Sequence, residues 1–96
     1  MDKLKKFGLM EKIVNELNDL KNSQHALVAK LGKIEVDNIE LGDSKLEDEL
    51  PKMHQRVSKN LDTIAEILDY FSLKTDKFSE KNNIEALKEQ ELIKNI

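Results

Sequence analysis

Apolar residues recur along the first part of the chain in alternating steps of three and four. The series begins at Met10 and ends at Leu41. A spacing of about 3.5 residues places one continuous stripe along an α-helix and is typical of helices that pack on other helices. With Met10 as position a of the seven-residue repeat, the remaining positions are a at Leu17, Gln24, Leu31 and Asn38, and d at Ile13, Leu20, Leu27, Ile34 and Leu41.

A further set of apolar side chains widens this stripe. Phe7, Val14 and Val28 occupy e positions, beside the a row. A stripe built from a, d and e positions is wider than the contact that one partner helix makes. It therefore suits packing against more than one neighbour.

A second stripe with the same spacing follows, and Leu61 and Leu68 add e positions to it. Pro51 interrupts its front, because proline lacks the backbone N–H and disfavours helical geometry in the residue before it. Proline is favoured at the first position of a helix, so we expect a short capped turn and then a helix over about 51–80. The stripe contains Leu46, Leu50, Met53, Val57, Asn60, Ile64, Ile67, Phe71, Lys74 and Phe78.

The two stripes are out of phase with each other at Gly42. Glycine suits the left-handed position that follows a helix, and Asp43 or Ser44 suits the N-cap of the next one. These signals predict a helix over about 2–41 and a turn near 42–44. An alternative ends the first helix near Gly32 or Lys33 and leaves residues 36–42 as a loop. Residues 81–96 have a thin apolar stripe and are expected to form a short third helix or a frayed tail.

These elements predict an all-α fold, either a long helical hairpin over residues 1–80 or a coiled-coil helical bundle. The composition agrees, since 39% of the residues are hydrophobic, 36% are charged and only 4% are aromatic. A lone hairpin leaves part of each wide stripe in water, so we expect oligomerisation to complete the bundle. The predicted interaction seam is Met10, Ile13, Leu17, Leu20, Gln24, Leu27, Leu31, Ile34, Met53, Val57, Ile64, Ile67, Phe71 and Phe78.

Three seam positions are polar: Gln24, Asn38 and Asn60. One interpretation is that they select the register and the partner, as buried amides do in coiled coils. The other is that they lie where the bundle opens to solvent. The second interpretation is favoured for Asn38 and Asn60, and the two are equally balanced for Gln24, which has full heptads on both sides.

The sequence lacks the residue patterns typical of nucleic-acid binding, metal binding and catalysis. The net charge of −3 speaks against a nucleic-acid partner, and the absence of cysteine excludes thiolate sites. Neither His25 nor His54 has a carboxylate or histidine four residues away, and Ile39 stands where an EF-hand loop needs an oxygen ligand. We therefore expect no enzyme activity, no cofactor and no metal. The start of the chain lacks the apolar segment of a secretory signal, so a cytoplasmic protein is expected, either free or peripheral on a membrane-bound complex.

The expected partners are protein helices, from the same chain or from related small subunits, in a homo- or hetero-oligomer. An alternative is an acidic inhibitory module, of the immunity-protein or antitoxin type, that binds through residues 47–49 or through Asp62, Glu66 and Asp69. A solvated outer face is the favoured interpretation of this last trio. A third hypothesis is a peripheral membrane adaptor, because lysines flank Leu4, Phe7 and Met10 at the start of the first helix.

The stretch Leu-Asn-Asp-Leu-Lys-Asn-Ser-Gln over residues 17–24 is followed by Leu27, Leu31 and Ile34. It resembles the snapin/pallidin-type helical proteins, which have a Leu-x-x-Ser-Gln element, aliphatic residues at these offsets and a proline that opens the second helix, where Pro51 stands. The resemblance spans roughly residues 13–78. It implies a small subunit of a rod-shaped coiled-coil hetero-complex in lysosome-related organelle biogenesis and lysosome positioning, on the cytosolic face of endosomes. Gln24 would then be a seam residue of that assembly.

Overall fold

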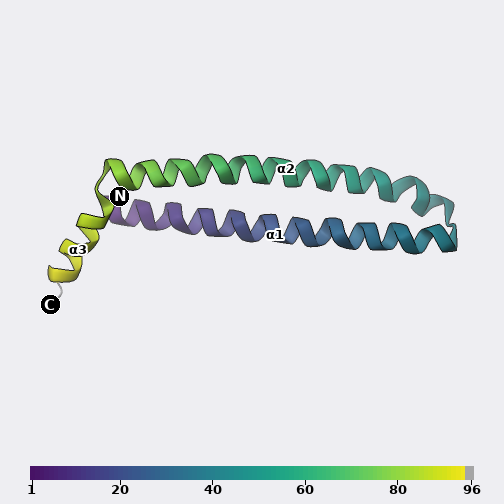
Figure 1. The fold of residues 1–96 in the computed structure, drawn as a ribbon, viewed down its shortest axis with the longest axis horizontal. Coiled ribbons are helices and arrows are strands. Elements are labelled where there is room, and N and C mark those ends of the chain that lie inside the picture. The colour runs from purple at the N-terminus through teal and green to yellow at the C-terminus, as the bar shows by residue number, and fades with distance from the viewer. Residues whose placement is uncertain (95–96) are drawn as a thin grey trace.

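The computed structural model describes residues 1–94 and shows an all-α chain with the predicted helical hairpin. Helix α1 spans Lys3–Leu41, α2 spans Ser44–Lys81 and α3 spans Ile84–Lys94. Helices α1 and α2 lie side by side and antiparallel, and α3 projects from the end where the N-terminus lies (Figure 1). The molecule is a rod that measures 67 × 24 × 17 Å.

The turn between α1 and α2 forms as the sequence predicts. Gly42 adopts the left-handed conformation with φ 74° and donates its N–H to the carbonyl of Asn38 at 2.6 Å. The Asp43 carboxylate accepts the N–H of Leu46 at 2.9 Å and caps α2. The alternative end of the first helix near Gly32 is wrong, because α1 continues through this residue to Leu41.

Asn38 closes this turn with its side chain. Its Nδ2 donates to the carbonyl of Asp43 at 3.1 Å, and its Oδ1 accepts the N–H of Asp43 at 3.0 Å. The side chain is buried, so the expectation that it lies where the bundle opens to solvent is wrong. Asn38 therefore acts within the hairpin, where it holds the last turn of α1 against the start of α2.

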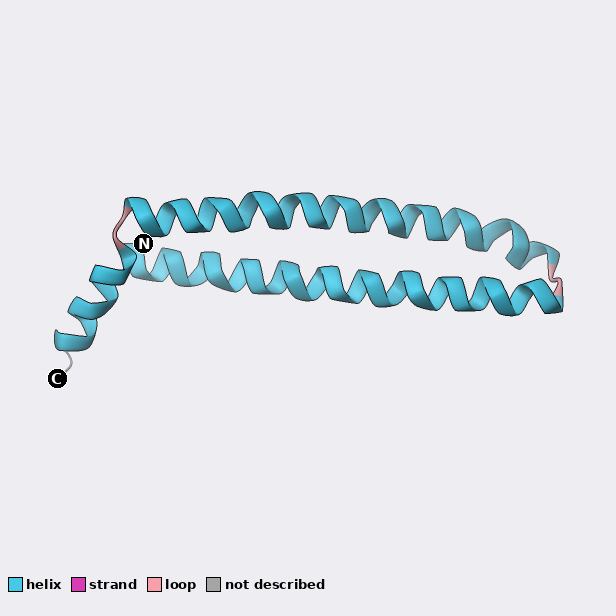
Figure 2. Ribbon diagram, in the orientation of Figure 1, coloured by secondary structure: helices cyan, strands magenta, loops and turns pink. Residues whose placement is uncertain are grey.

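The start of α2 differs from its expected position. The helix begins at Ser44, and Pro51 lies inside it, instead of a short turn followed by a helix from Pro51. The Asp43 cap supplies a helix start before the proline, and Pro51 then removes only the hydrogen bond to the carbonyl of Glu47. Proline inside a helix permits a bend, and α2 curves toward α1 over its first turns (Figure 2).

The tail forms a short third helix over its described residues instead of fraying. Asn83 takes a left-handed backbone conformation, with φ 53°, and redirects the chain into α3. Ile84 then packs against the end of the hairpin with 0% of its surface exposed. At the same end the Lys88 ammonium lies 5.0 Å from the centroid of the Phe7 ring. This contact joins α3 to α1 through a cation–π interaction.

The core of the hairpin consists of the a and e rows of both helices. On α1 these rows include Phe7, Met10, Val14, Leu17, Val28 and Leu31, all buried or half-buried. On α2 they include Leu50, Val57, Leu61, Ile64, Leu68, Phe71, Thr75 and Phe78, again buried or half-buried. The a and e positions are about 40° apart around a helix, so a single neighbouring helix covers both rows.

Replacement of Asn38 with alanine should destabilise the hairpin, because it leaves both backbone groups of Asp43 without the side-chain partner they have in the native turn. We expect a loss of about 1–3 kcal/mol in the free energy of unfolding, measured by urea titration followed by circular dichroism. Asn22→Ala is the matched control, since Asn22 is exposed on α1 and its replacement should have little effect. Equal stability of the two variants would contradict the proposed role of Asn38.

Replacement of Gln24 with leucine should stabilise the hairpin. Gln24 is half-buried in the a row, between Leu17 and Leu31, and this row packs against α2. An apolar side chain of similar size should raise the free energy of unfolding by about 1 kcal/mol. Thermal unfolding of the two proteins at equal concentration measures this difference. A lower melting temperature for Gln24→Leu would show that the amide makes a necessary contact.

Candidate functional site

The d positions of both helices remain exposed on the surface of the hairpin. Between 37% and 45% of the surface of each of seven such residues is accessible to solvent. The seven are Ile13, Leu20, Leu27 and Ile34 on α1 and Leu46, Met53 and Ile67 on α2. The hairpin therefore leaves exposed the wholly apolar d row of α1, and beside it a d row of α2 that is apolar except at Asn60 and Lys74.

The register of the two helices is fixed by contacts near both ends of the hairpin. Glu35 and His54 form a hydrogen bond across the helices at 2.7 Å, and Val14 and Thr75 line one common groove. These two pairs are three heptads apart on each helix, so each step of one heptad back along α1 matches a step of one heptad forward along α2. The d residue of each heptad directly precedes the e residue, so Ile34 and Met53 lie at nearly the same height along the rod, as Glu35 and His54 do. We call such a pair of d residues a layer, and the layers are Leu41/Leu46, Ile34/Met53, Leu27/Asn60, Leu20/Ile67 and Ile13/Lys74.

Both d rows lie on the same side of the hairpin. Two antiparallel helices are related approximately by a two-fold axis that is normal to the plane containing both helix axes. This rotation keeps each side of the plane in place, so residues with the same heptad letter on the two helices lie on the same side of the hairpin. The groove that contains Val14 and Thr75 is also lined by Glu11, Asn15, Ser72 and Asp76, which marks the e side as polar. The d rows occupy the other side, because a helix places d and e on opposite flanks of a.

We call this surface the d face and define it by the five layers above. All its residues are apolar except Asn60 and Lys74. It runs the length of the hairpin for about 40 Å, from Ile13 to Leu41 at ~1.5 Å per residue. Monomeric proteins commonly expose single apolar residues, whereas long contiguous apolar patches mark interaction sites.

The structure divides the predicted interaction seam into two sets. One set packs inside the hairpin and consists of Met10, Leu17, Gln24, Leu31, Val57, Ile64, Phe71 and Phe78. The other set is exposed on the d face and consists of Ile13, Leu20, Leu27, Ile34, Met53 and Ile67. The first set builds the hairpin, and the second set remains available to another molecule.

The acidic groups of the inhibitory-module hypothesis lie outside the d face. Asp62, Glu66 and Asp69 are exposed on α2 at c and f positions, on the outer surface of the hairpin. Asp48 forms a 3.2 Å ion pair with Lys52 along the surface of α2. Ion pairs of this exposed kind contribute little to stability.

The basic start of α1 has its apolar side occupied. Phe7 and Met10 are buried in the hairpin, and the Lys6 ammonium lies 5.1 Å from the centroid of the Phe78 ring. Phe7 and Met10, which would enter a lipid surface, are thus packed inside the molecule, whereas Ile13 of the same segment is exposed. This packing weakens the membrane-adaptor hypothesis.

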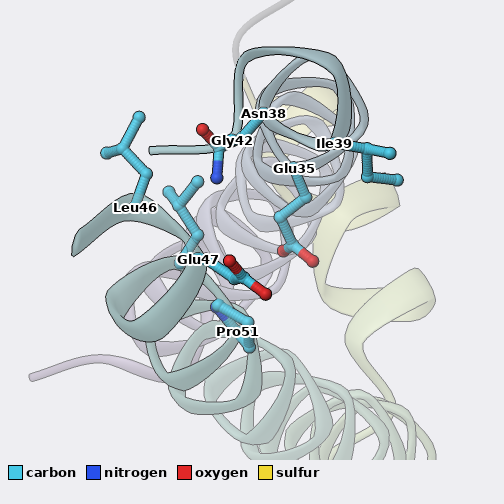
Figure 3. A pocket seen from close by; sticks show the side chains of 8 residues that line it. Glu35, Asn38, Ile39, Gly42, Leu46, Glu47 and Pro51 are labelled. Atoms are coloured by element: carbon cyan, nitrogen blue, oxygen red, sulfur yellow. The ribbon is translucent and has the colours of Figure 1, made fainter. Parts of the chain in front are cut away.

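A cavity of ≈ 330 Å³ lies beside the turn. Figure 3 shows Glu35 from α1 and Glu47 from α2 with their carboxylates facing this space, beside Pro51. The Glu35 carboxylate already accepts a hydrogen bond from His54. Within residues 1–94, no group of three or more His, Cys, Asp and Glu side chains could hold a metal ion.

The Glu35–His54 pair is a cross-helix polar contact that the sequence did not predict. Heptad spacing within one helix relates His54 to residues three or four positions away, whereas its partner is 19 residues away. Both residues occupy e positions, and this is the only indication of the contact in the sequence. It predicts the contact only when the rotation and the register of the two helices are known.

The chain matches no known protein family, no curated protein and no solved structure. Among the described residues, no helix is both long enough and apolar enough to span a membrane.

The Glu35–His54 pair should contribute measurably to stability, because both side chains are about one-third exposed and their contact links the two helices. A double-mutant cycle with Glu35→Ala and His54→Ala should give a coupling energy of about 0.5–1.5 kcal/mol. The exposed Lys12–Glu16 pair, at 3.9 Å, is the control and should give a smaller value. Coupling that does not exceed this control would contradict a role of the pair in holding the helices.

Proposed function

We propose that the protein is a non-enzymatic assembly subunit that binds other α-helices through the d face. One observation carries this proposal: the two d rows form a continuous, heptad-spaced apolar surface on one side of the hairpin. In helical bundles, further helices pack against heptad-spaced apolar rows on two adjacent helices.

The choice of rows supports this role. On α1, the e row that faces α2 includes Lys21 and Glu35, whereas the exposed d row is apolar from Ile13 to Leu41. An α1 selected only to fold in an isolated hairpin would gain more by burying its d row. The exposure of the more apolar row is instead expected for a surface that is covered in an assembly.

The free energy available at this face is substantial. Full burial of a Leu, Ile or Met side chain contributes about 1.5–3 kcal/mol. Seven of the eight apolar d-face residues retain roughly two-fifths of their surface in water, and Leu41 retains 75%. Burial of each of the seven by a docked helix contributes on the order of 1 kcal/mol. These contributions add to those of the partner's own apolar side chains and oppose the cost of association.

The two polar members of the face supply selectivity. Asn60 and Lys74 are exposed on α2, in line with Met53 and Ile67. A partner that leaves the Asn60 amide without a hydrogen bond is disfavoured, and so is one that buries the Lys74 ammonium. The snapin/pallidin resemblance would set such an assembly on the cytosolic face of endosomes, whereas the proposed binding mode rests on the d face alone.

The proposal predicts where partners contact the chain in its native cell. A photoreactive amino acid at Leu27, on the d face, should cross-link to a helical protein, which includes a second copy of the chain. The same group at Val36 is the matched control, because Val36 is also on α1 and 64% exposed but lies on the outer surface. Mass spectrometry of the products identifies the partner and the contact site.

A second variant tests the chemistry of the face. Ile34→Glu combined with Ile67→Glu should abolish cross-linking from Leu27, because it places two charges in the apolar contact. Val36→Glu combined with Leu73→Glu, at exposed positions off the face, should leave it intact. Circular dichroism verifies that both double variants remain helical. Cross-links that arise mainly from Val36, or from the Asp62 surface, would overturn the proposal.

A further inference from the structure

We propose that the occupant of the d face is a second copy of this chain, docked head to tail. The two hairpins would form a four-helix bundle in which the turn of one copy lies beside the open end of the other. This inference rests on the proposed function, because it names the partner of the same surface.

The layers of the d face are complementary to themselves in this arrangement. Leu27/Asn60 is the central one of the five layers, so a two-fold axis through it superposes that layer on itself. The layer Ile34/Met53 then meets Leu20/Ile67, which pairs apolar residues with apolar residues. Asn60 meets Asn60 of the second copy. An amide has both donors and acceptors, so two of them can satisfy each other, as paired asparagines do in coiled coils.

The alternative arrangement of two copies, with the turns together, lacks this match. Its two-fold axis runs along the rod and stacks α1 of one copy on α2 of the other. Asn60 then lies against Leu27, which offers its amide no side-chain hydrogen bond. An amide buried without a partner loses its hydrogen bonds to water without replacement, and this loss occurs twice in a symmetric dimer. The central layer therefore selects the head-to-tail arrangement.

The charges at the two ends of the hairpin favour the same arrangement. Residues 35–52, around the turn, include only two basic residues, Lys45 and Lys52, against Glu35, Asp37, Glu40, Asp43, Glu47, Asp48 and Glu49. At the open end, residues 1–12 and 74–81 include Asp2, Glu11, Asp76 and Glu80 against Lys3, Lys5, Lys6, Lys12, Lys74, Lys77 and Lys81. Head-to-tail docking brings the acidic end of one copy to the basic end of the other, whereas the alternative brings like charges together.

Lys74 illustrates how the outermost layers fit. In the head-to-tail dimer it lies opposite Leu46 of the second copy, close to the acidic residues 47–49 that follow. The aliphatic part of a lysine can cover an apolar side chain while its ammonium remains in solvent. The charged position at the end of the d row thus has an oppositely charged neighbour on the second copy.

The size of the face is adequate for a stable dimer. Two helices about 40 Å long with axes 8–10 Å apart present on the order of 800 Å² on one side. This area corresponds to the contribution of one partner in an interface of standard size. A second copy would cover all five layers at once.

Sedimentation equilibrium of the purified full chain tests the stoichiometry. The expected species is a dimer of the 11.1 kDa chain, which the Ile34→Glu/Ile67→Glu variant should convert to a monomer. The Val36→Glu/Leu73→Glu variant should remain a dimer.

Single cysteines test the orientation, because the chain has none of its own. Asn60→Cys should form a disulfide between two copies under mild oxidation, since head-to-tail docking brings the two side chains together. Asp62→Cys, two residues away on the outer surface, is the matched control and should not form one. A pyrene label on Lys45→Cys, beside the turn, should show no excimer emission, which only the arrangement with the turns together would produce.

The outcomes separate this inference from the proposed function. A monomer in solution, combined with cross-links from Leu27 to a different protein in the cell, would overturn the second copy as occupant and leave the assembly role intact. Strong pyrene excimer emission in a dimer would overturn the head-to-tail orientation. Absence of any cross-link from the d face would overturn both.

Discussion

The architecture depends on one geometric constraint: a single helix covers two adjacent rows of its neighbour, whereas each long helix of this chain presents three apolar rows. The hairpin satisfies the a and e rows, and the d row is left over. Each later feature follows from this mismatch between the width of the stripe and the width of one contact. It explains why a chain with clear heptads has only a narrow core and a long apolar surface.

Two polar contacts near the turn determine which rows face inward. The Asn38 amide bonds to both backbone groups of Asp43, and Glu35 bonds to His54 on the facing helix. These contacts fix the rotation of α1 against α2 close to the point where the chain reverses. A rotation that buried the d rows instead would separate Glu35 from His54. These polar contacts and the packed a rows thus favour the same rotation, in which the d rows are exposed along the rod.

Much of the fold was predictable from the sequence, because heptad spacing, Gly42 and the Asp43 cap are local signals. Pro51 misled the prediction of where α2 begins, since a cap upstream outweighs one missing hydrogen bond inside a long helix. The division of the seam was not predictable. The d and e rows flank the a row on opposite sides, and both contain apolar residues, so only the contacts across the helices distinguish them. The burial of Ile84 was likewise not predictable, because it depends on packing against the end of the folded hairpin.

The position of the turn that Asn38 closes affects the order in which the two helices pair during folding. Pairs near the turn, such as Glu35 and His54, are close in sequence, whereas those at the open end, such as Lys6 and Phe78, are separated by most of the chain. Closure of a short loop costs less entropy than closure of a long one, so the helices should pair from the turn outward. In the proposed assembly, the layers Leu41/Leu46 and Ile34/Met53 would then be formed before the lysine-rich end has closed. A partner helix would meet the acidic end of the d face first, and the order of folding would give the association a direction.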